Sequence, residues 1–223
     1  MFIKKVCLIS AIFALTSAAP KRTSRSTVPI WHMPCGEGSD LEITSSEHFE
    51  EDIKFNFEIL RLQHQLTMSD YLNRDYEYLY ERVRIGIRDH QYIPNWVPGK
   101  KDTNLVRRLA DADSQTIVNH FPKLHMDLQK FAVAFEELIE DEPNSDVQNA
   151  LRTTQSYLMM MLCEVESHII ALPSLQLPTR VERSIMNSVE RNPVDDTRRL
   201  VRDWGVLLKY RDYLHAWRHV FNY

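Results

Sequence analysis

Apolar residues that recur every three or four positions over long stretches constrain the fold of this chain more than any other feature. The clearest stretch runs without a miss through Ile117, Phe121, Leu124, Leu128, Phe131, Phe135 and Leu138. This spacing places apolar side chains along one face of an α-helix. The chain has only five glycines, and short antiparallel strands need frequent turns that use glycine. We therefore expect an all-α fold.

The first half of the chain is expected to hold two helices. The first begins near Ser46, where acidic residues favour the positive end of the helix dipole, and runs for about 35–45 residues. Its expected inner face consists of Phe55, Ile59, Leu62, Leu66, Leu72, Tyr76, Leu79 and Val83. The second helix falls within 104–141. Pro122 lies inside it, and an interior proline removes a backbone hydrogen bond, so we expect a kink there.

Two more helices are expected in the second half. The third covers about 145–172 and ends before Pro173, with an inner face of Val147, Leu151, Thr154, Leu158, Met161, Val165, Ile169 and Leu172. The fourth begins after a capping aspartate, Asp195 or Asp196. Its inner face consists of Leu200, Trp204, Leu207, Leu208, Leu214, Trp217 and Phe221.

The lengths of the connections favour one topology. About four residues join the second and third helices, so these two must be antiparallel neighbours. The other two connections, of about 12–18 and about 20 residues, are long enough to cross the length of a helix. Two long crossover loops around one tight hairpin favour a long-chain four-helix bundle with up-up-down-down topology. An up-down-up-down path is also compatible with loops of this length.

The N-terminus is typical of a secretory signal peptide. Two lysines precede an apolar run of about ten residues, and small residues follow as far as Ala18. We expect a signal peptide at 1–18, a flexible arm at 19–45 that is rich in proline, serine and threonine, and the helical domain at 46–223. The protein is then secreted and extracellular, with no membrane insertion; a retained membrane anchor is the weaker interpretation. The mature chain begins after Ala18, or after the dibasic pair that ends at Arg22.

Charge and cysteine content narrow the partners. Acidic residues outnumber basic ones, 31 to 27, and the arginines are spread along the chain, so nucleic acid is not an expected partner. Cys7 leaves with the signal peptide. In an oxidising compartment the two remaining cysteines, Cys35 and Cys163, are expected to form a disulfide. An arm folded back along the third helix would bring them together.

The sequence offers little for catalysis or metal binding. His215 and His219 are four residues apart on a helix but have no third ligand nearby, and a surface ion pair explains Glu164 and His168 better than a metal site. Cys163 is better explained as a structural cysteine than as a nucleophile. We therefore expect no enzyme activity, no catalytic residues, no metal and no cofactor.

Several segments resemble one family in their order and spacing. These are LQHQLTMSDYLN (62–73), FAVAFEELIEDE (131–142), the amphipathic third helix and DWGVLLKYRDYLHAWRHVF (203–221). The chain resembles the long-chain helical cytokines of the interleukin-6 family, and looks closest to the ciliary neurotrophic factor and cardiotrophin-like cytokine branch. The resemblance implies a monomeric growth-factor-like ligand that binds and bridges cell-surface cytokine receptors, with signalling through Janus kinases.

The resemblance also suggests where receptors bind. The branch carries Phe-x-x-Lys at the start of its last helix, and Arg199 and Arg202 occupy the equivalent positions here, so the phenylalanine is missing. We expect a receptor-binding site of exposed residues at Arg198, Arg199 and Arg202, completed by Trp96, with Arg218 in the basic end of the helix. A balanced charge cluster is the simpler interpretation of the arginines, and Trp96 is equally explained by packing over the end of the bundle.

A second function class is compatible with the same pattern. Aromatic residues on the second and fourth helices could line a cavity, which would make the protein a secreted carrier of lipid or of a small apolar ligand. Sustained heptad-like spacing is more typical of a packed seam, and this favours the signalling ligand. A secreted enzyme is a distant third.

Overall fold

The computed structural model describes residues 26–36, 49–74, 76 and 92–223. This part of the chain is entirely helix and connecting loop, without a strand, so the predicted all-α class is confirmed. Its long helices are α1 (Phe49–Leu72), α5 (Phe121–Asp141), α6 (Ser145–Ala171) and α8 (Asp196–Phe221). The shorter elements are η1 (Ile30–His32), α3 (Lys100–Arg107), α4 (Ser114–Val118), η4 (Arg183–Ile185) and α7 (Ser188–Arg191).

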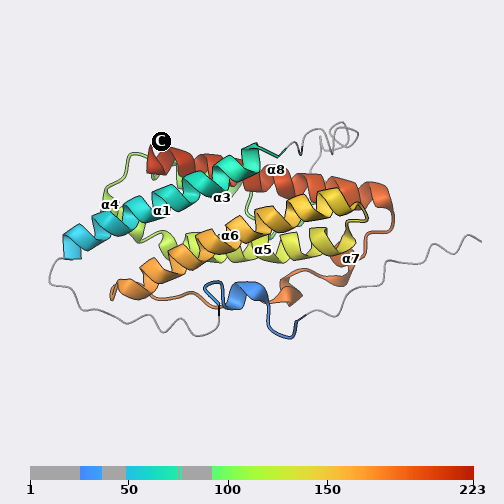
Figure 1. The fold of residues 1–223 in the computed structure, drawn as a ribbon, viewed down its shortest axis with the longest axis horizontal. Coiled ribbons are helices and arrows are strands. Elements are labelled where there is room, and N and C mark those ends of the chain that lie inside the picture. The colour runs from blue at the N-terminus through green and yellow to red at the C-terminus, as the bar shows by residue number, and fades with distance from the viewer. Residues whose placement is uncertain (1–25, 37–48, 75, 77–91) are drawn as a thin grey trace, which may run out of the picture.

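The four long helices surround one apolar core (Figure 1). α1 packs against α6 and α8, α5 packs against the same two helices, and α3 lies on α8. Aromatic side chains fill the seam between α5 and α8: the ring of Tyr210 lies 5.0 Å from Phe131 and 5.2 Å from Phe135. No helix in the described part of the chain has the length and apolar character needed to cross a bilayer.

Helices α6 and α8 begin and end close to where the sequence predicts. Asn144 caps α6, its side chain accepting the backbone N–H of Asp146 at 2.9 Å. Asp195 caps α8 by accepting the N–H of Arg198 at 2.8 Å. All eight residues of the predicted inner face of the third helix are buried. Side-chain caps and a regular stripe therefore suffice to place these two helices.

The prediction of one helix over 104–141 with a kink at Pro122 is wrong. The segment divides into α3, α4 and α5, and Pro122 lies in the first turn of α5. A proline there loses no hydrogen bond, because the first N–H groups of a helix have no partner inside it. The apolar stripe that begins at Ile117 is nevertheless buried throughout.

Within α1 the predicted inner face is also wrong, although Tyr76, which follows α1, is buried as predicted. Phe55, Leu62 and Leu66 are 66%, 57% and 54% exposed. The buried face consists of Leu60, His64, Thr67, Met68 and Tyr71. Two polar residues belong to it, and each has a hydrogen-bonding partner: His64 Nδ1 lies 2.6 Å from the Tyr223 hydroxyl, and the Thr67 hydroxyl donates to the carbonyl of Gln63 at 2.9 Å. The predicted extension beyond α1, to Val83, falls largely outside the described residues.

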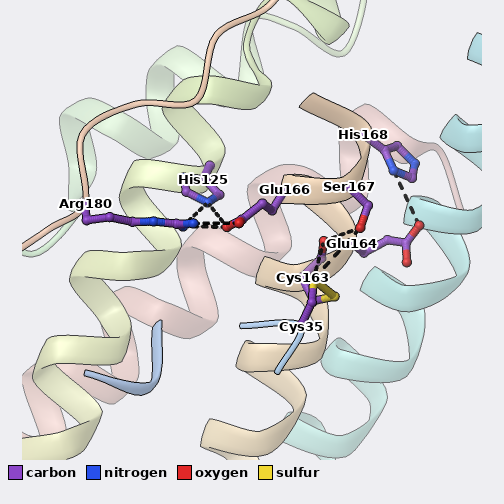
Figure 2. Close-up of a disulfide and its surroundings, with 8 residues drawn as sticks. All are labelled: Cys35, His125, Cys163, Glu164, Glu166, Ser167, His168 and Arg180. Carbon is purple, nitrogen blue, oxygen red and sulfur yellow. Dashed lines mark hydrogen bonds and ion pairs between the residues drawn. A yellow bond between two sulfur atoms is a disulfide. The ribbon is translucent and has the colours of Figure 1, made fainter. Parts of the chain in front are cut away.

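Residues 26–36 form a fixed strap, which corrects the prediction of a flexible arm for this segment. Trp31 is completely buried, and its Nε1 donates to the carbonyl of Val181 at 2.7 Å. Cys35 and Cys163 form the expected disulfide (Figure 2). The strap is thus held by a buried indole and by a covalent bond to α6, and Arg183 Nη1 donates to the carbonyl of Ser26 at 2.9 Å.

A buried polar network fixes the crossover between α6 and α7. The Glu166 carboxylate lies 2.9 Å from His125 Nε2 and accepts Arg180 Nη2 at 2.6 Å (Figure 2). On the other side of the ring, Gln129 joins His125 Nδ1 to the backbone N–H of Val181. Burial acts to raise the pKa of Glu166, but the hydrogen bonds and charges of Arg180 and His125 outweigh it and lower the pKa to about 2. The network ties α5, α6 and the crossover together, so it supports the fold.

The pair predicted at the surface of α6 lies partly inside the protein. His168 Nδ1 is 3.4 Å from Glu164 Oε1, and the histidine is buried. Its ring lies 6.1 Å from the ring of Phe121. The His168 ring therefore packs against the start of α5, and its pair with Glu164 is not fully solvated.

His64 makes stability depend on pH. Burial lowers its pKa from 6.5 to about 3. Below pH 6.5 the unfolded chain therefore binds a proton that the folded chain does not bind until about pH 3. The free energy of unfolding decreases as the pH is lowered, and the slope approaches about 1.4 kcal/mol per pH unit. Urea unfolding between pH 7 and pH 5 should show this slope in the wild type and a flatter one in His64→Leu. His219→Leu, at an exposed histidine, should keep the wild-type slope; equal slopes in all three proteins would contradict the assignment.

Candidate functional site

One end of the molecule combines a short helix, the start of α8 and a loop from distant sequence. α7 begins with a capping box, in which the Asn187 side chain accepts the N–H of Glu190 and the Glu190 carboxylate accepts the N–H of Asn187, both at 2.9 Å. The chain then turns directly into α8, at the right-hand end of Figure 1. The loop 92–98 lies along the first turns of α8. We call this surface the α7–α8 patch; its outer residues are Tyr92, Val189, Pro193, Val194 and Arg198.

The loop is seated on α8 by a glycine and a lysine. A Cβ atom on Gly205 would lie 2.2 Å from Ile93 Cδ1, so only glycine leaves room for the isoleucine. Lys209 Nζ donates to the carbonyls of Pro94 and Val97, at 2.9 and 3.2 Å. A glycine inside a helix costs roughly 1 kcal/mol relative to alanine, and the docked loop accounts for its presence here.

Tyr92 and Arg198 form the middle of the α7–α8 patch. The guanidinium of Arg198 lies 4.7 Å from the centre of the Tyr92 ring, within the range of a cation–π contact. Tyr92 has a φ of 68°, a left-handed conformation that is uncommon for a bulky residue. Backbone strain of this kind clusters at binding sites. A hollow of about 90 Å³ opens beside the pair, lined by Tyr92, Val189, Glu190, Pro193, Val194, Arg198 and Arg202.

Two valines in the patch are far more exposed than an apolar side chain usually is. Val189 is 73% exposed and Val194 is 78% exposed. A residue just before a helix cap often packs on the residue at the fourth helical position. Val194 stands before the cap Asp195, but Arg199 holds the fourth position, so this packing is missing. Exposed apolar side chains gathered around a hollow are typical of protein-binding surfaces.

Trp96 lies between the α7–α8 patch and the apolar core. Its Nε1 donates to Glu190 Oε2 at 3.2 Å, and its ring packs against the apolar core. The sequence left two interpretations of Trp96 open, a receptor-binding residue or a side chain that packs over the end of the helices. The position of the side chain fits the second. Trp96 therefore holds α7 and the loop together from a half-buried position.

Arg202 does not lie on the surface, which corrects the expectation that it is exposed. Its side chain is 1% exposed, and its guanidinium donates to Asp141 at 2.9 Å, to Asp203 at 2.8 Å and to the carbonyl of Glu190 at 2.8 Å. Arg199 is also largely covered: its Nη1 lies 3.5 Å from Asp203 Oδ2, and its side chain is only 14% exposed. Arg198 is the arginine of this group that faces solvent.

Arg218 belongs to a different region. It lies twenty residues after Arg198 on the same helix, which places the two about 30 Å apart. Its Nε donates to the carbonyl of Tyr223 at 3.0 Å, and its guanidinium lies 5.8 Å from the ring of that residue. The structure therefore does not bring Arg218 to the α7–α8 patch.

Three exposed apolar residues of α1 form a second apolar surface. Phe55, Leu62 and Leu66 follow one another at seven and four residues, so they lie on one side of the helix. We call these three residues the α1 stripe. Its N-terminal part lies at the opposite end of the long axis from the α7–α8 patch (Figure 1). The two surfaces are therefore separate.

Sequence reasoning placed Trp96 and Arg198 near this region but missed Tyr92, Val189 and Val194. One signal was available for Val194: an apolar residue before a helix cap without an apolar partner at the fourth helical position. No sequence pattern marks Tyr92, because its exposure and its backbone conformation depend on how the loop is seated on α8.

Metal chemistry finds no support in the described part of the chain, where no three histidine, cysteine, aspartate or glutamate side chains gather in a way that could hold an ion. Comparison with known proteins adds no assignment: the chain matches no protein-family model, no curated protein and no solved structure.

Proposed function

We propose that the protein is a secreted, cytokine-like signalling ligand that binds and bridges cell-surface receptors. The observation that carries the proposal is the α7–α8 patch, where Val189 and Val194 stand exposed around the contact between Arg198 and Tyr92. Apolar side chains around an arginine and a tyrosine are the composition that protein interfaces favour at their centres. The patch contains Arg198, one of the residues expected from sequence at the receptor-binding site; Arg199 and Arg202, which the family resemblance places at the positions of its motif, are covered.

We also propose that the four long helices form the up-up-down-down bundle of the long-chain cytokines. Each of α1 and α5 has α6 and α8 as neighbours. In Figure 1, α1 and α5 run from left to right by the colour bar, and α6 and α8 run from right to left. These observations support the topology expected from two long crossovers.

Secretion is supported by the disulfide and by the expected signal peptide. A disulfide between Cys35 and Cys163 would persist in an oxidising, extracellular compartment. The signal peptide at 1–18 lies outside the described residues and rests on sequence. Signalling through Janus kinases rests on the family resemblance.

Bridging requires two surfaces that do not overlap. The α7–α8 patch and the α1 stripe meet this requirement, because they lie on different helices and the start of α1 lies at the opposite end of the long axis from α7 (Figure 1). Each could contact a different receptor chain while the other remains accessible. The ligand would thereby hold two receptor chains at a fixed separation.

The alternative function, a carrier of lipid or of a small apolar ligand, has less support. The aromatic rings of α5 and α8 pack on one another, with Phe131 and Tyr213 centred 5.5 Å apart, so they do not line a cavity. Native mass spectrometry of the secreted protein should give the mass of the mature chain alone. A bound lipid would favour the carrier.

Val194→Asp should weaken receptor binding at least tenfold, because it places a charge among the apolar residues of the patch and a tenfold loss needs only about 1.4 kcal/mol. Folding should be unaffected, since the side chain is largely solvated. The matched control is Leu177→Asp, another exposed apolar residue in the same crossover. Signalling and receptor affinity should fall only in the first variant. Equal activity of the two folded variants would remove the patch as a receptor site.

A further inference from the structure

Four cations share one face of α3. The helix has the sequence KKDTNLVR and is followed by Arg108, and Lys100, Lys101, Arg107 and Arg108 are all exposed. At 100° per residue these four side chains fall within about a third of the helix circumference. They form two pairs, one at each end of the helix, about 10 Å apart along the axis. We call them the α3 basic face.

The positive charge of this face is not neutralised. Asp102, the acidic residue of the helix, is engaged elsewhere: its carboxylate accepts the N–H of Gly99 and the ammonium of Lys123, both at 2.9 Å. None of the four cations makes an ion pair with any residue that the structure describes. Lys100 and Lys101 also lie at the positive end of the helix dipole, where a cation costs about 0.3–1 kcal/mol. Among the described residues, these four cations thus form a positively charged face on a chain of net charge −4, and such a face attracts anionic partners.

We propose that the α3 basic face binds a sulfated polysaccharide of the cell surface or extracellular matrix. Sulfate groups repeat along such a chain, and two pairs of cations in line can engage successive groups. Arginine can contact the oxygens of a tetrahedral anion in a bidentate manner, while lysine acts as a point charge. The site goes beyond receptor binding and would retain the protein near the cells that secrete it. It rests on the proposed secretion, because sulfated polysaccharides are extracellular.

The chemistry of the face argues against other polyanions. Single-stranded nucleic acid is bound with the help of stacked aromatic rings, and α3 contains no aromatic residue. A membrane-surface helix buries a broad apolar face, whereas Leu105 is the exposed apolar side chain here, at 40%. A linear, strongly sulfated polymer needs only the cations that are present.

The test is binding of the full secreted protein to immobilised heparin. Replacing Lys100, Lys101, Arg107 and Arg108 with glutamine should raise the dissociation constant at least about tenfold at physiological salt, and should flatten the dependence on salt, because fewer counterions are released. Circular dichroism confirms that the variant folds. The partial variant Arg107→Gln/Arg108→Gln should lie between the two.

The matched control is Lys54→Gln/Arg152→Gln. It removes two exposed cations outside α3, the same number of charges as the partial α3 variant removes. It should bind heparin like the wild type; equal weakening in these two double variants would mean that only overall charge matters, and would overturn the proposal. Competition by DNA as strong as that by heparin, or undiminished competition by desulfated heparin, would also overturn it. Receptor binding by the α3 variants should be unchanged, so failure of this site is distinguishable from failure of the proposed function.

Discussion

Replacing Arg202 with leucine is expected to lower the free energy of unfolding by about 3–5 kcal/mol, the usual cost of breaking a buried ion pair by removing one partner. The change leaves Asp141 and Asp203 without the guanidinium that lies 2.9 Å from one and 2.8 Å from the other. Leucine and arginine have similar helix propensities, so the effect reports the lost ion pairs. Urea unfolding followed by circular dichroism measures it.

The pH dependence of the Arg202 variant provides an internal check. Burial raises the pKa of Asp203 to about 6 even with Arg202 beside it, and loss of the cation should raise it further. A carboxyl group with a raised pKa holds a proton in the folded state that the unfolded state releases, so stability should fall as pH rises. The loss should therefore be larger at pH 8 than at pH 5. The control Arg198→Leu, on the exposed side of the same helix, should cost less than about 1 kcal/mol. Similar losses in the two variants would contradict the assignment of Arg202 as buried.

The second large effect is expected from the disulfide. Replacing both Cys35 and Cys163 with serine should lower the free energy of unfolding by about 2–5 kcal/mol, because the bond joins positions 128 residues apart and restricts the unfolded chain strongly. In the folded state, the strap would keep only non-covalent anchors, such as the hydrogen bonds between Trp31 and Val181 and between Arg183 and Ser26. Thermal or urea unfolding under oxidising conditions measures the change.

A reductant supplies the control for the disulfide. The wild type with reductant should unfold at the same urea concentration as the double variant, and the double variant should not respond to reductant at all. A wild-type protein that is indifferent to reductant, and whose peptides carry two free thiols, would show that the bond does not form.

Local signals in the sequence were sufficient for α6 and α8. Each begins at a side-chain cap, Asn144 or Asp195, and carries an apolar stripe that matches the helical period. Each also ends near a recognisable signal, at Pro173 or at the C-terminus. In α6, where cap, period and stop agree, the sequence predicts both the helix and its buried face. In α8 these signals place the helix but not the whole of its buried face: Leu200 and Leu208 are only partly buried, and Tyr210 and Tyr213 are buried outside the predicted face.

The face of α1 could not be predicted, because apolar residues occur on more than one side of the helix. The side that packs inward includes His64 and Thr67, whose Nδ1 and hydroxyl hydrogen-bond with Tyr223 and Gln63. Tyr223 is 159 residues away. A count of apolar residues favours Leu62 and Leu66 instead, and nothing local reveals the error.

The burial of Arg202 depends on tertiary contacts in the same way. Among three arginines at the start of one helix, only its position faces Asp141, which lies 61 residues earlier. Sequence reasoning treated the three as equivalent exposed cations. In the folded protein Arg198 faces solvent, Arg199 is largely covered, and Arg202 is a buried structural residue.

A ligand that bridges two receptor chains can be identified by the mass of the complex it forms. Size-exclusion chromatography with light scattering would be run on the secreted protein mixed with purified ectodomains of a panel of cytokine receptors. We expect a complex that holds one ligand and two receptor chains. We also expect that Val194→Asp and Leu62→Asp, on the two separate surfaces, each reduce it to one ligand and one receptor. A wild-type protein that elutes alone in every mixture would contradict the proposal.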